Sequence, residues 1–258
     1  MRRLLAAVLG AAAVTAAVTA MPTDAVATSV HTHGLHGLAG SPTGVRHSFN
    51  WAGYIKTGGH YTSVSGSWRV PTLRTSVNGY SSTWVGVDGA LGHDAYLLQT
   101  GTEQDVVRGR ASYYAWYEVI TPTRAAPETP IRSMTIHAGD SMTATVAQVE
   151  AGTWTVTLRD NTSRVSSSVR VAFAGPGRSA EWIEEDTDVN GTISAAPDWQ
   201  SVAFGNATVN GANPNLKARQ AVDLEDTSGT VEARTGNPAN GNAFGITWFA
   251  PGTPTRIG

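Results

Sequence analysis

The segment from residue 142 to residue 158 reads MTATVAQVEAGTWTVTL. Apolar and polar residues alternate in Met142–Val146 and again in Trp154–Leu158, which is the pattern of strands with one buried face. Residues 150–152 (EAG) separate the two runs and are typical of a turn. The segment therefore predicts a hairpin of two antiparallel strands.

The same alternation returns in other parts of the chain, for example in Val169–Phe173 and Phe244–Trp248. The sequence contains 28 Gly and 12 Pro, which interrupt these runs as turn residues do. Only residues 216–226 are candidates for a short helix. We therefore expect an all-β fold, an antiparallel sandwich of two large curved sheets of the concanavalin A-like or jelly-roll type.

The first 27 residues have the composition of a secretory signal peptide. Met1-Arg2-Arg3 is basic, and an uncharged run of small and apolar residues follows from Leu4 to Ala20. Cleavage after Ala20 or after Ala27 fits this pattern. A membrane anchor is the alternative, but the Ala and Thr content makes the run only weakly apolar. We expect a secreted, extracellular protein that has no contact with a membrane once the signal is removed.

Residues 28–46 are poor in apolar side chains and contain His31, His33 and His36. A His-rich tract can bind a metal ion. We favour a linker or short pro-segment instead, because chain termini of this composition seldom belong to a core. Residues 47–258 are then one domain, a size that suits a single β-sandwich.

The overall composition excludes several classes of function. The net charge is −2, so the chain lacks the basic surface that nucleic acids require. It contains no Cys, which excludes thiol catalysis and thiolate metal sites. It also has no Gly-x-Ser-x-Gly, His-Glu-x-x-His or Asp-Thr-Gly motif, and a His base would be protonated in acid.

Two strand-like runs each place one polar side chain among apolar neighbours: Leu97–Gly101 (LLQTG) and Ser179–Glu184 (SAEWIE). A carboxylate such as Glu181 can take a proton from water. An amide N–H such as that of Gln99 can stabilise the oxyanion that forms when this water attacks a carbonyl. Together they suffice for peptide hydrolysis without a metal ion.

Aromatic and acidic residues cluster in five runs that occur in the same order as in the eqolisins, the glutamic peptidase family of secreted acid endopeptidases. The runs are Asn50–Tyr54, Trp84–Gly89, Leu98–Gly101, Tyr114–Glu118 and Ala180–Ile183. The chain strongly resembles this family from Asn50 to about Phe249. The resemblance implies a bent sandwich of two large antiparallel sheets.

By this resemblance Gln99 and Glu181 are the catalytic dyad. Glu103 stands where the family pattern has Asp, and we assign it to the active-site cleft as well. The resemblance assigns four further residues to the substrate-binding cleft: Trp51, Asp88, Trp116 and Glu118. It implies a monomer that acts on proteins or peptides without a cofactor or a bound metal.

Two other functions fit a β-sandwich that is rich in tryptophan. A glycoside hydrolase needs two carboxyl groups about 5–5.5 Å apart when it retains configuration. Glu181 and Glu184 have the wrong spacing to share one face of a strand. A carbohydrate-binding module would use the tryptophans as stacking platforms and would need no Gln/Glu pair.

The run Asp186–Gly191 copies the first half of a calcium-binding loop. Position twelve is Pro197 instead of the bidentate Glu, and no helices are expected beside it. We therefore expect an acidic turn without calcium.

Overall fold

The structure is a computed structural model, and it describes residues 29–40, 46–90 and 96–257. The predicted signal peptide, residues 1–27, lies outside the described residues. So do residues 28 and 41–45 of the predicted linker or pro-segment. Within the described ranges, no helix has the length and apolar character needed to cross a membrane.

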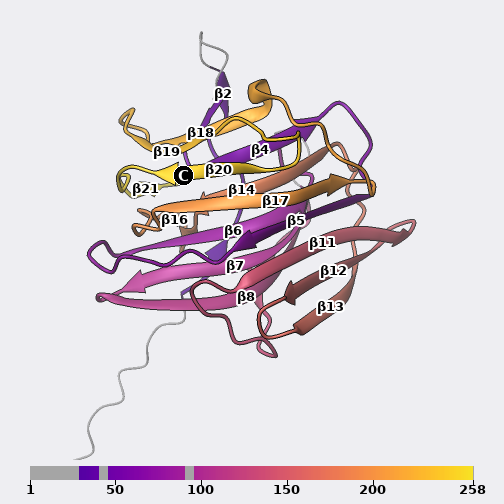
Figure 1. Cartoon of the computed structure of the whole chain (residues 1–258), viewed down its shortest axis with the longest axis horizontal. Helices are drawn as coiled ribbons and strands as arrows, with labels where there is room; N and C mark the ends of the chain where they lie inside the picture. Colours follow the sequence, from indigo (N-terminus) through magenta and orange to yellow (C-terminus); the bar gives the residue numbers. More distant parts are fainter. Residues whose placement is uncertain (1–28, 41–45, 91–95, 258) are drawn as a thin grey trace, which may run out of the picture.

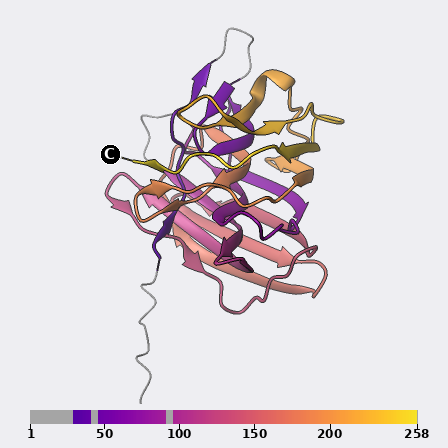
Figure 2. The same ribbon diagram turned by 90° about the vertical axis from the view of Figure 1, so that its left-hand side faces the viewer.

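Two large antiparallel sheets pack against each other, as the sequence predicts (Figures 1 and 2). The strands of the first sheet are, in spatial order, β18 (Ala221–Glu225), β4 (Trp51–Thr57), β14 (Ser179–Asp186), β6 (Gly79–Val87), β7 (Leu97–Val107) and β8 (Arg110–Thr121). The strands of the second are β19 (Val231–Thr235), β20 (Phe244–Trp248), β17 (Ser201–Val209), β5 (Ser63–Arg69), β11 (Ser141–Glu150), β12 (Thr153–Asp160) and β13 (Val165–Ala172).

Short strands complete the edges. The pair β18–β19 joins the two sheets at one side. Strand β3 (Arg46–Ser48) pairs with β18 in parallel, and β2 (Ala39–Gly40) pairs with β3. At the other edge of the first sheet, β9 (Arg124–Ala125) and β10 (Thr129–Pro130) both pair with β8. A small separate sheet contains β1 (His31–Thr32), β15 (Asp188–Val189), β16 (Thr192–Ile193) and β21 (Thr255–Arg256).

The predicted hairpin at residues 142–158 is confirmed as β11 and β12, which pair with each other in antiparallel register. The expectation of a short helix within residues 216–226 is largely wrong. Only a three-residue 3₁₀ turn, Ala218–Gln220, forms there, and β18 follows it. Buried Val222 and Leu224 alternate with more polar neighbours, so strand pairing buries them better than a helix would.

Apolar side chains cover both faces of the first sheet. The interior between the sheets contains large buried side chains from both layers, including Trp68, Trp154, Trp182 and Phe204. The outer face of the first sheet carries a second buried cluster: Trp51, Ile55, Trp84, Ala90, Leu97, Trp116, Ile183 and Val222. We call this the outer cluster. Because both faces are covered, all eight residues of β14 are buried and the strand lacks simple alternation.

The carboxyl group of Glu184 lies in the interior between the sheets. Glu184 accepts hydrogen bonds from the Thr83 hydroxyl and from the Gln104 amide. Burial raises the pKa of Glu184 to about 8, although these two hydrogen bonds oppose the rise. The group is therefore neutral in the acid range.

A stability measurement across pH tests this neutral form of Glu184. Below about pH 4.5 the group is protonated in both the folded and the unfolded state, so its full contribution to stability is present. As the pH rises toward 8, Glu184 loses its proton in the unfolded chain before it does so in the folded chain. The stabilisation of the folded state by the protonated carboxyl is therefore lost. We expect Glu184→Gln to reduce the fall in the free energy of unfolding between about pH 4 and 8 by roughly 3–5 kcal/mol.

Urea unfolding at both pH values provides this measurement. Glu150→Gln is a matched control, because its side chain is 62% exposed. A fall that is equally steep in the wild type and in Glu184→Gln would show that Glu184 is not the group that titrates.

Candidate active site

Gln99 and Glu181 lie in one row across three neighbouring strands. Gly86 of β6 is directly opposite Glu181 of β14 on one side and Gln99 of β7 on the other. Directly opposite residues of antiparallel strands point to the same face. The side chains of Glu181 and Gln99 therefore both point to the outer face of the sheet, and Glu118 of β8 continues the row beyond Gln99.

Gly86 lets neighbouring side chains pack closely over the strand between Gln99 and Glu181. A Cβ atom at this position would lie 2.9 Å from the Trp84 ring and 3.1 Å from the Cβ of Gln99. The Cα atoms of Gln99 and Glu181 are two strand spacings apart, about 10 Å.

The amide of Gln99 donates two hydrogen bonds. Its Nε2 lies 2.7 Å from Glu118 Oε2 and 3.2 Å from the backbone carbonyl oxygen of His33. Glu118 therefore fixes the orientation of the amide, and the second N–H already points at a peptide carbonyl. An oxyanion donor requires this orientation.

Glu181 is fully buried. Burial raises the pKa of its carboxyl well above the usual range; the Ser179 hydroxyl opposes the rise and Asp88 adds to it. In this closed state burial favours the neutral acid form of Glu181. Because desolvation is the main cause, opening the site to water would lower the pKa and restore the carboxylate that a general base requires.

Part of the predicted linker or pro-segment covers the outer face. The imidazole of His33 stacks on Trp116, with ring centroids 4.0 Å apart and planes 8° from parallel. Leu35 and Leu38 pack against the outer cluster. Asn50 ties the segment down, since its Nδ2 donates to the Gly34 carbonyl at 2.7 Å. We call residues 31–38 the covering segment.

Two other residues predicted for the cleft, Trp51 and Asp88, lie near opposite ends of β14, the strand whose outer face carries Glu181. Trp51 is on the same face and meets Trp84 edge to face at 4.8 Å. Asp88 has φ = 68°, and its carboxylate accepts hydrogen bonds from the backbone N–H groups of Gly177 and Arg178. It therefore anchors the loop that leads into β14.

Glu118 and Glu103 lie on the same face of the sheet as Gln99. Burial raises the pKa of Glu118 to about 8. Glu103 is four residues along β7 from Gln99, about 13 Å away. There its Oε1 lies 3.3 Å from His31 Nδ1 and accepts a hydrogen bond from the Thr187 hydroxyl. Glu103 is therefore a contact of the covering segment and not a direct neighbour of the dyad.

Sequence reasoning missed several residues of this face. Glu185 accepts hydrogen bonds from Asn50 Nδ2 at 2.9 Å and from Trp84 Nε1 at 2.7 Å, and it lies 3.3 Å from His33 Nδ1. Glu128, at the edge beside β8, lies 3.1 Å from His33 Nε2. The His31-Thr32-His33 spacing was the available signal, because it places both imidazoles on one side of an extended chain.

The predicted acidic turn at Asp186–Gly191 does not gather its carboxyl groups. Asp186 ends β14 and is buried beside Glu232, which adds to the rise that burial causes in its pKa. Asp188 belongs to β15, which pairs with β1. The carboxyl groups therefore belong to separate strands, with different neighbours.

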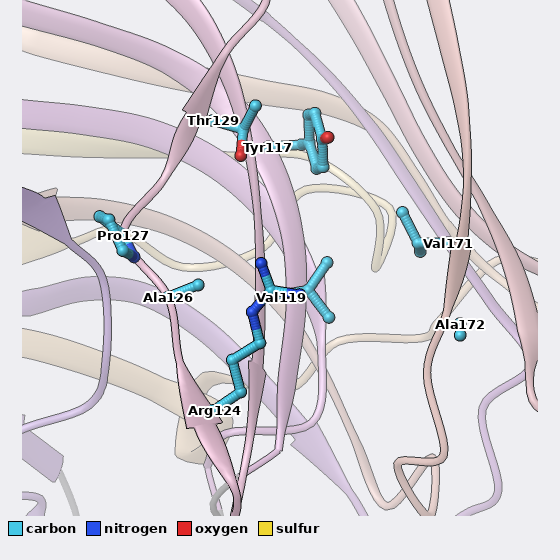
Figure 3. A pocket seen from close by; sticks show the side chains of 8 residues that line it. All are labelled: Tyr117, Val119, Arg124, Ala126, Pro127, Thr129, Val171 and Ala172. Atoms are coloured by element: carbon cyan, nitrogen blue, oxygen red, sulfur yellow. The ribbon is translucent and has the colours of Figure 1, made fainter.

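A pocket of about 260 Å³ opens on the other side of β8 (Figure 3). Tyr117 and Val119 of β8 face Val171 and Ala172 of β13 across it, and Arg124 is at its rim. Among its lining residues there is no carboxylate or imidazole. This pocket therefore offers no acid or base side chain among the residues that line it.

Comparisons with known proteins agree with the resemblance in the sequence. The Peptidase A4 family model matches residues 49–248. Aspergillopepsin-2 of Aspergillus niger is 30% identical over 80% of this chain and 79% of its own length. Scytalidopepsin B of Scytalidium lignicola is 32% identical over 53% of this chain and 51% of its own.

Solved structures show the same fold. Scytalido-glutamic peptidase with a transition state analog inhibitor superposes with a TM-score of 0.62, at 20% identity, over 78% of this chain and 98% of that one. Aspergilloglutamic peptidase from Aspergillus niger gives a TM-score of 0.56, at 28% identity, over 66% of this chain and 99% of that one. These solved peptidases therefore share the sandwich fold of this chain.

Proposed function

Because the chain belongs to the Peptidase A4 family of glutamic peptidases, we propose that it is a secreted, acid-active endopeptidase with Glu181 as general base and Gln99 as oxyanion donor. One observation carries the proposal. Glu181 and Gln99 point to the same face from either side of Gly86, and the Gln99 amide already donates to a peptide carbonyl.

The reaction begins with a water molecule bound between the two side chains. Ionised Glu181 accepts a proton from this water, whose oxygen attacks the carbonyl carbon of the scissile peptide bond. Gln99 Nε2 donates to the oxyanion that develops, a contact worth about 3 kcal/mol in other hydrolases. Protonated Glu181 then gives its proton to the leaving nitrogen as the C–N bond breaks.

The two groups suit acidic solution for different reasons. A free glutamate titrates near pH 4.3, so a solvated carboxylate persists in mild acid. The amide of Gln99 does not titrate in this range, so the donor is unaffected by acid. Glu118, which holds the amide, still accepts a hydrogen bond through the carbonyl oxygen of its protonated form.

The covering segment fits the role of an inhibitory pro-segment. The His33 carbonyl accepts the hydrogen bond that the mechanism assigns to a substrate carbonyl. The segment also excludes water from Gln99, which has no exposed surface. Related peptidases have been solved with a transition state analog and with the tripeptide Ala-Ile-His, so the fold accepts peptides as ligands. We assign residues 28–46 to this role and residues 47–258 to the peptidase domain.

Neither carbohydrate function is favoured by a specific observation. Glu181 and Glu184 lie on opposite faces of β14, because Glu184 bonds to Thr83 and Gln104 in the interior. These two carboxyl groups therefore cannot flank one glycosidic bond.

Hydrolysis assays separate the proposal from its alternatives. After the chain has been held in acid to remove the covering segment, it should digest denatured casein between about pH 3 and 5. EDTA should leave the rate unchanged, because no step uses a metal ion. A β-glucan should remain intact. Loss of casein digestion in EDTA would contradict the mechanism, and glucan cleavage without casein cleavage would contradict the function.

A further inference from the structure

Two histidines of the covering segment lie close to three acidic residues of the first sheet and its edge. The set His33–Glu103–Glu128 and the set His31–Glu103–Asp105 each place their ligand atoms within 4.8 Å of one another. The histidines come from the covering segment, whereas the acids come from β7 and from the edge beside β8. The cluster therefore bridges the covering segment and the first sheet.

The separations match those around a tetrahedral metal ion. His33 Nε2 lies 3.1 Å from Glu128 Oε2 and 3.8 Å from Glu103 Oε2, and His31 Nδ1 lies 3.3 Å from Glu103 Oε1. Ligand atoms at the usual zinc distances, about 2.0–2.1 Å, lie about 3.3–3.4 Å from one another. A small shift of the side chains would bring the three ligand atoms of His33, Glu103 and Glu128 into coordination range.

Two buried oxygens point into this cluster without a hydrogen-bond partner among the described residues. They are Glu103 Oε2 and Asp105 Oδ1, in side chains that are 0% and 5% exposed. No described lysine or arginine forms an ion pair with the acids of the cluster. The site therefore contains buried acceptor oxygens that a divalent cation would satisfy.

The neighbours of the cluster resemble the outer shell of a metal site. His33 directs Nε2 at the acids while its other ring nitrogen, Nδ1, lies 3.3 Å from Glu185 Oε2. Metal-binding histidines commonly donate their second N–H to a carboxylate in this way. Thr187 Oγ1 donates to Glu103 Oε1 at 2.7 Å, as second-shell groups do to a ligating carboxylate.

We propose that His33, Glu103 and Glu128 bind one divalent transition-metal ion of the Zn²⁺ class, which fastens the covering segment over Gln99, while His31 and Asp105 lie beside this site and share Glu103 with it. Mixed imidazole and carboxylate ligands suit Zn²⁺, whereas Ca²⁺ and Mg²⁺ prefer oxygen alone. The regulatory part of this inference rests on the proposed function. The metal site itself does not.

Calorimetric titration of Zn²⁺ at about pH 7 tests the site in the full chain carrying Glu181→Gln, a variant that lacks the proposed general base. We expect one ion to bind per chain and no binding of Ca²⁺. Glu128→Gln and His33→Ala should each weaken Zn²⁺ binding on the order of 100-fold. His137→Ala should not, because His137 is a surface histidine with a 73% exposed side chain.

Circular dichroism establishes that each variant is folded, and Glu128→Gln preserves the shape of a side chain at the edge of the sheet. Equal Zn²⁺ affinity in all variants would overturn the site. Failure of the parent chain, which carries only Glu181→Gln, to bind Zn²⁺ would overturn it as well. Binding is read without hydrolysis, so failure of the peptidase assay would leave this result intact.

Hydrogen exchange tests whether the ion fastens the segment. With free Zn²⁺ at 100 times its Kd, opening of residues 31–38 should become about 100-fold rarer, and their amide exchange should slow accordingly. In Glu128→Gln the same Zn²⁺ concentration should have no such effect. Unchanged exchange in the parent chain, despite bound Zn²⁺, would overturn the fastening.

Discussion

Replacing Glu181 with glutamine is expected to reduce kcat/KM for a casein-derived peptide by roughly 10³–10⁴-fold. Glutamine has the same length and fits the same buried position on β14, so the fold should be preserved. It cannot accept a proton from water, and no other described carboxyl group lies in the row beside Gly86 on that side. The loss should therefore appear in kcat, measured at about pH 4 with acid-treated protein.

Glu184→Gln is the matched control for this experiment. It makes the same chemical change three residues along the same strand, but on the interior face beside Thr83. Its activity should stay within about twofold of the wild type, because Glu184 contacts no residue of the outer face that carries the dyad. If Glu181→Gln retained full activity, Glu181 would not be the general base.

The β-sandwich could be predicted because strand alternation is a local property. The hairpin at residues 142–158 has one face in the core and one in water, so its period is visible in the sequence. In β6, β7 and β14 both faces are buried, and the alternation disappears. The sequence could not show that Trp182 packs in the interior while Trp84 belongs to the outer cluster.

The row that joins Gln99 to Glu181 could not be derived from spacing alone. Its geometry depends on the register of β14 on β6 and of β6 on β7. A slip of one residue in either pairing would turn a side chain to the opposite face. Gln99 and Glu181 could be proposed as a dyad only because the order of five sequence runs resembles a known family, whose model matches residues 49–248.

The covering segment shows the limit of composition as evidence. Its few apolar residues predict a linker, and Leu35 and Leu38 are too few to reveal a packed element. Its position instead depends on contacts with residues far along the chain, such as His33 with Gln99, 66 residues away, and with Glu118, 85 residues away. Contacts of this kind leave no periodic signal in the sequence.

Replacing Gln99 with alanine should lower kcat by about 10²–10³-fold, with a much smaller change in KM. The amide N–H stabilises negative charge that exists in the transition state and not in the bound substrate, so its loss acts on kcat. Because an amide does not titrate, the pH dependence of the residual activity should keep the shape of the wild-type profile. Steady-state kinetics between about pH 3 and 6 measure both quantities.

Gln148→Ala supplies the control for Gln99→Ala, because Gln148 lies in β11 of the second sheet, outside the row that contains the dyad. Its kinetics should match those of the wild type. A loss in Gln99→Ala that is confined to KM would mean that Gln99 only binds the substrate carbonyl in the ground state. The hydrogen bond from Gln99 to the His33 carbonyl, which is a ground-state peptide group, would then represent the whole of its function. A loss in kcat would show instead that the same N–H contributes more as the carbonyl becomes an oxyanion.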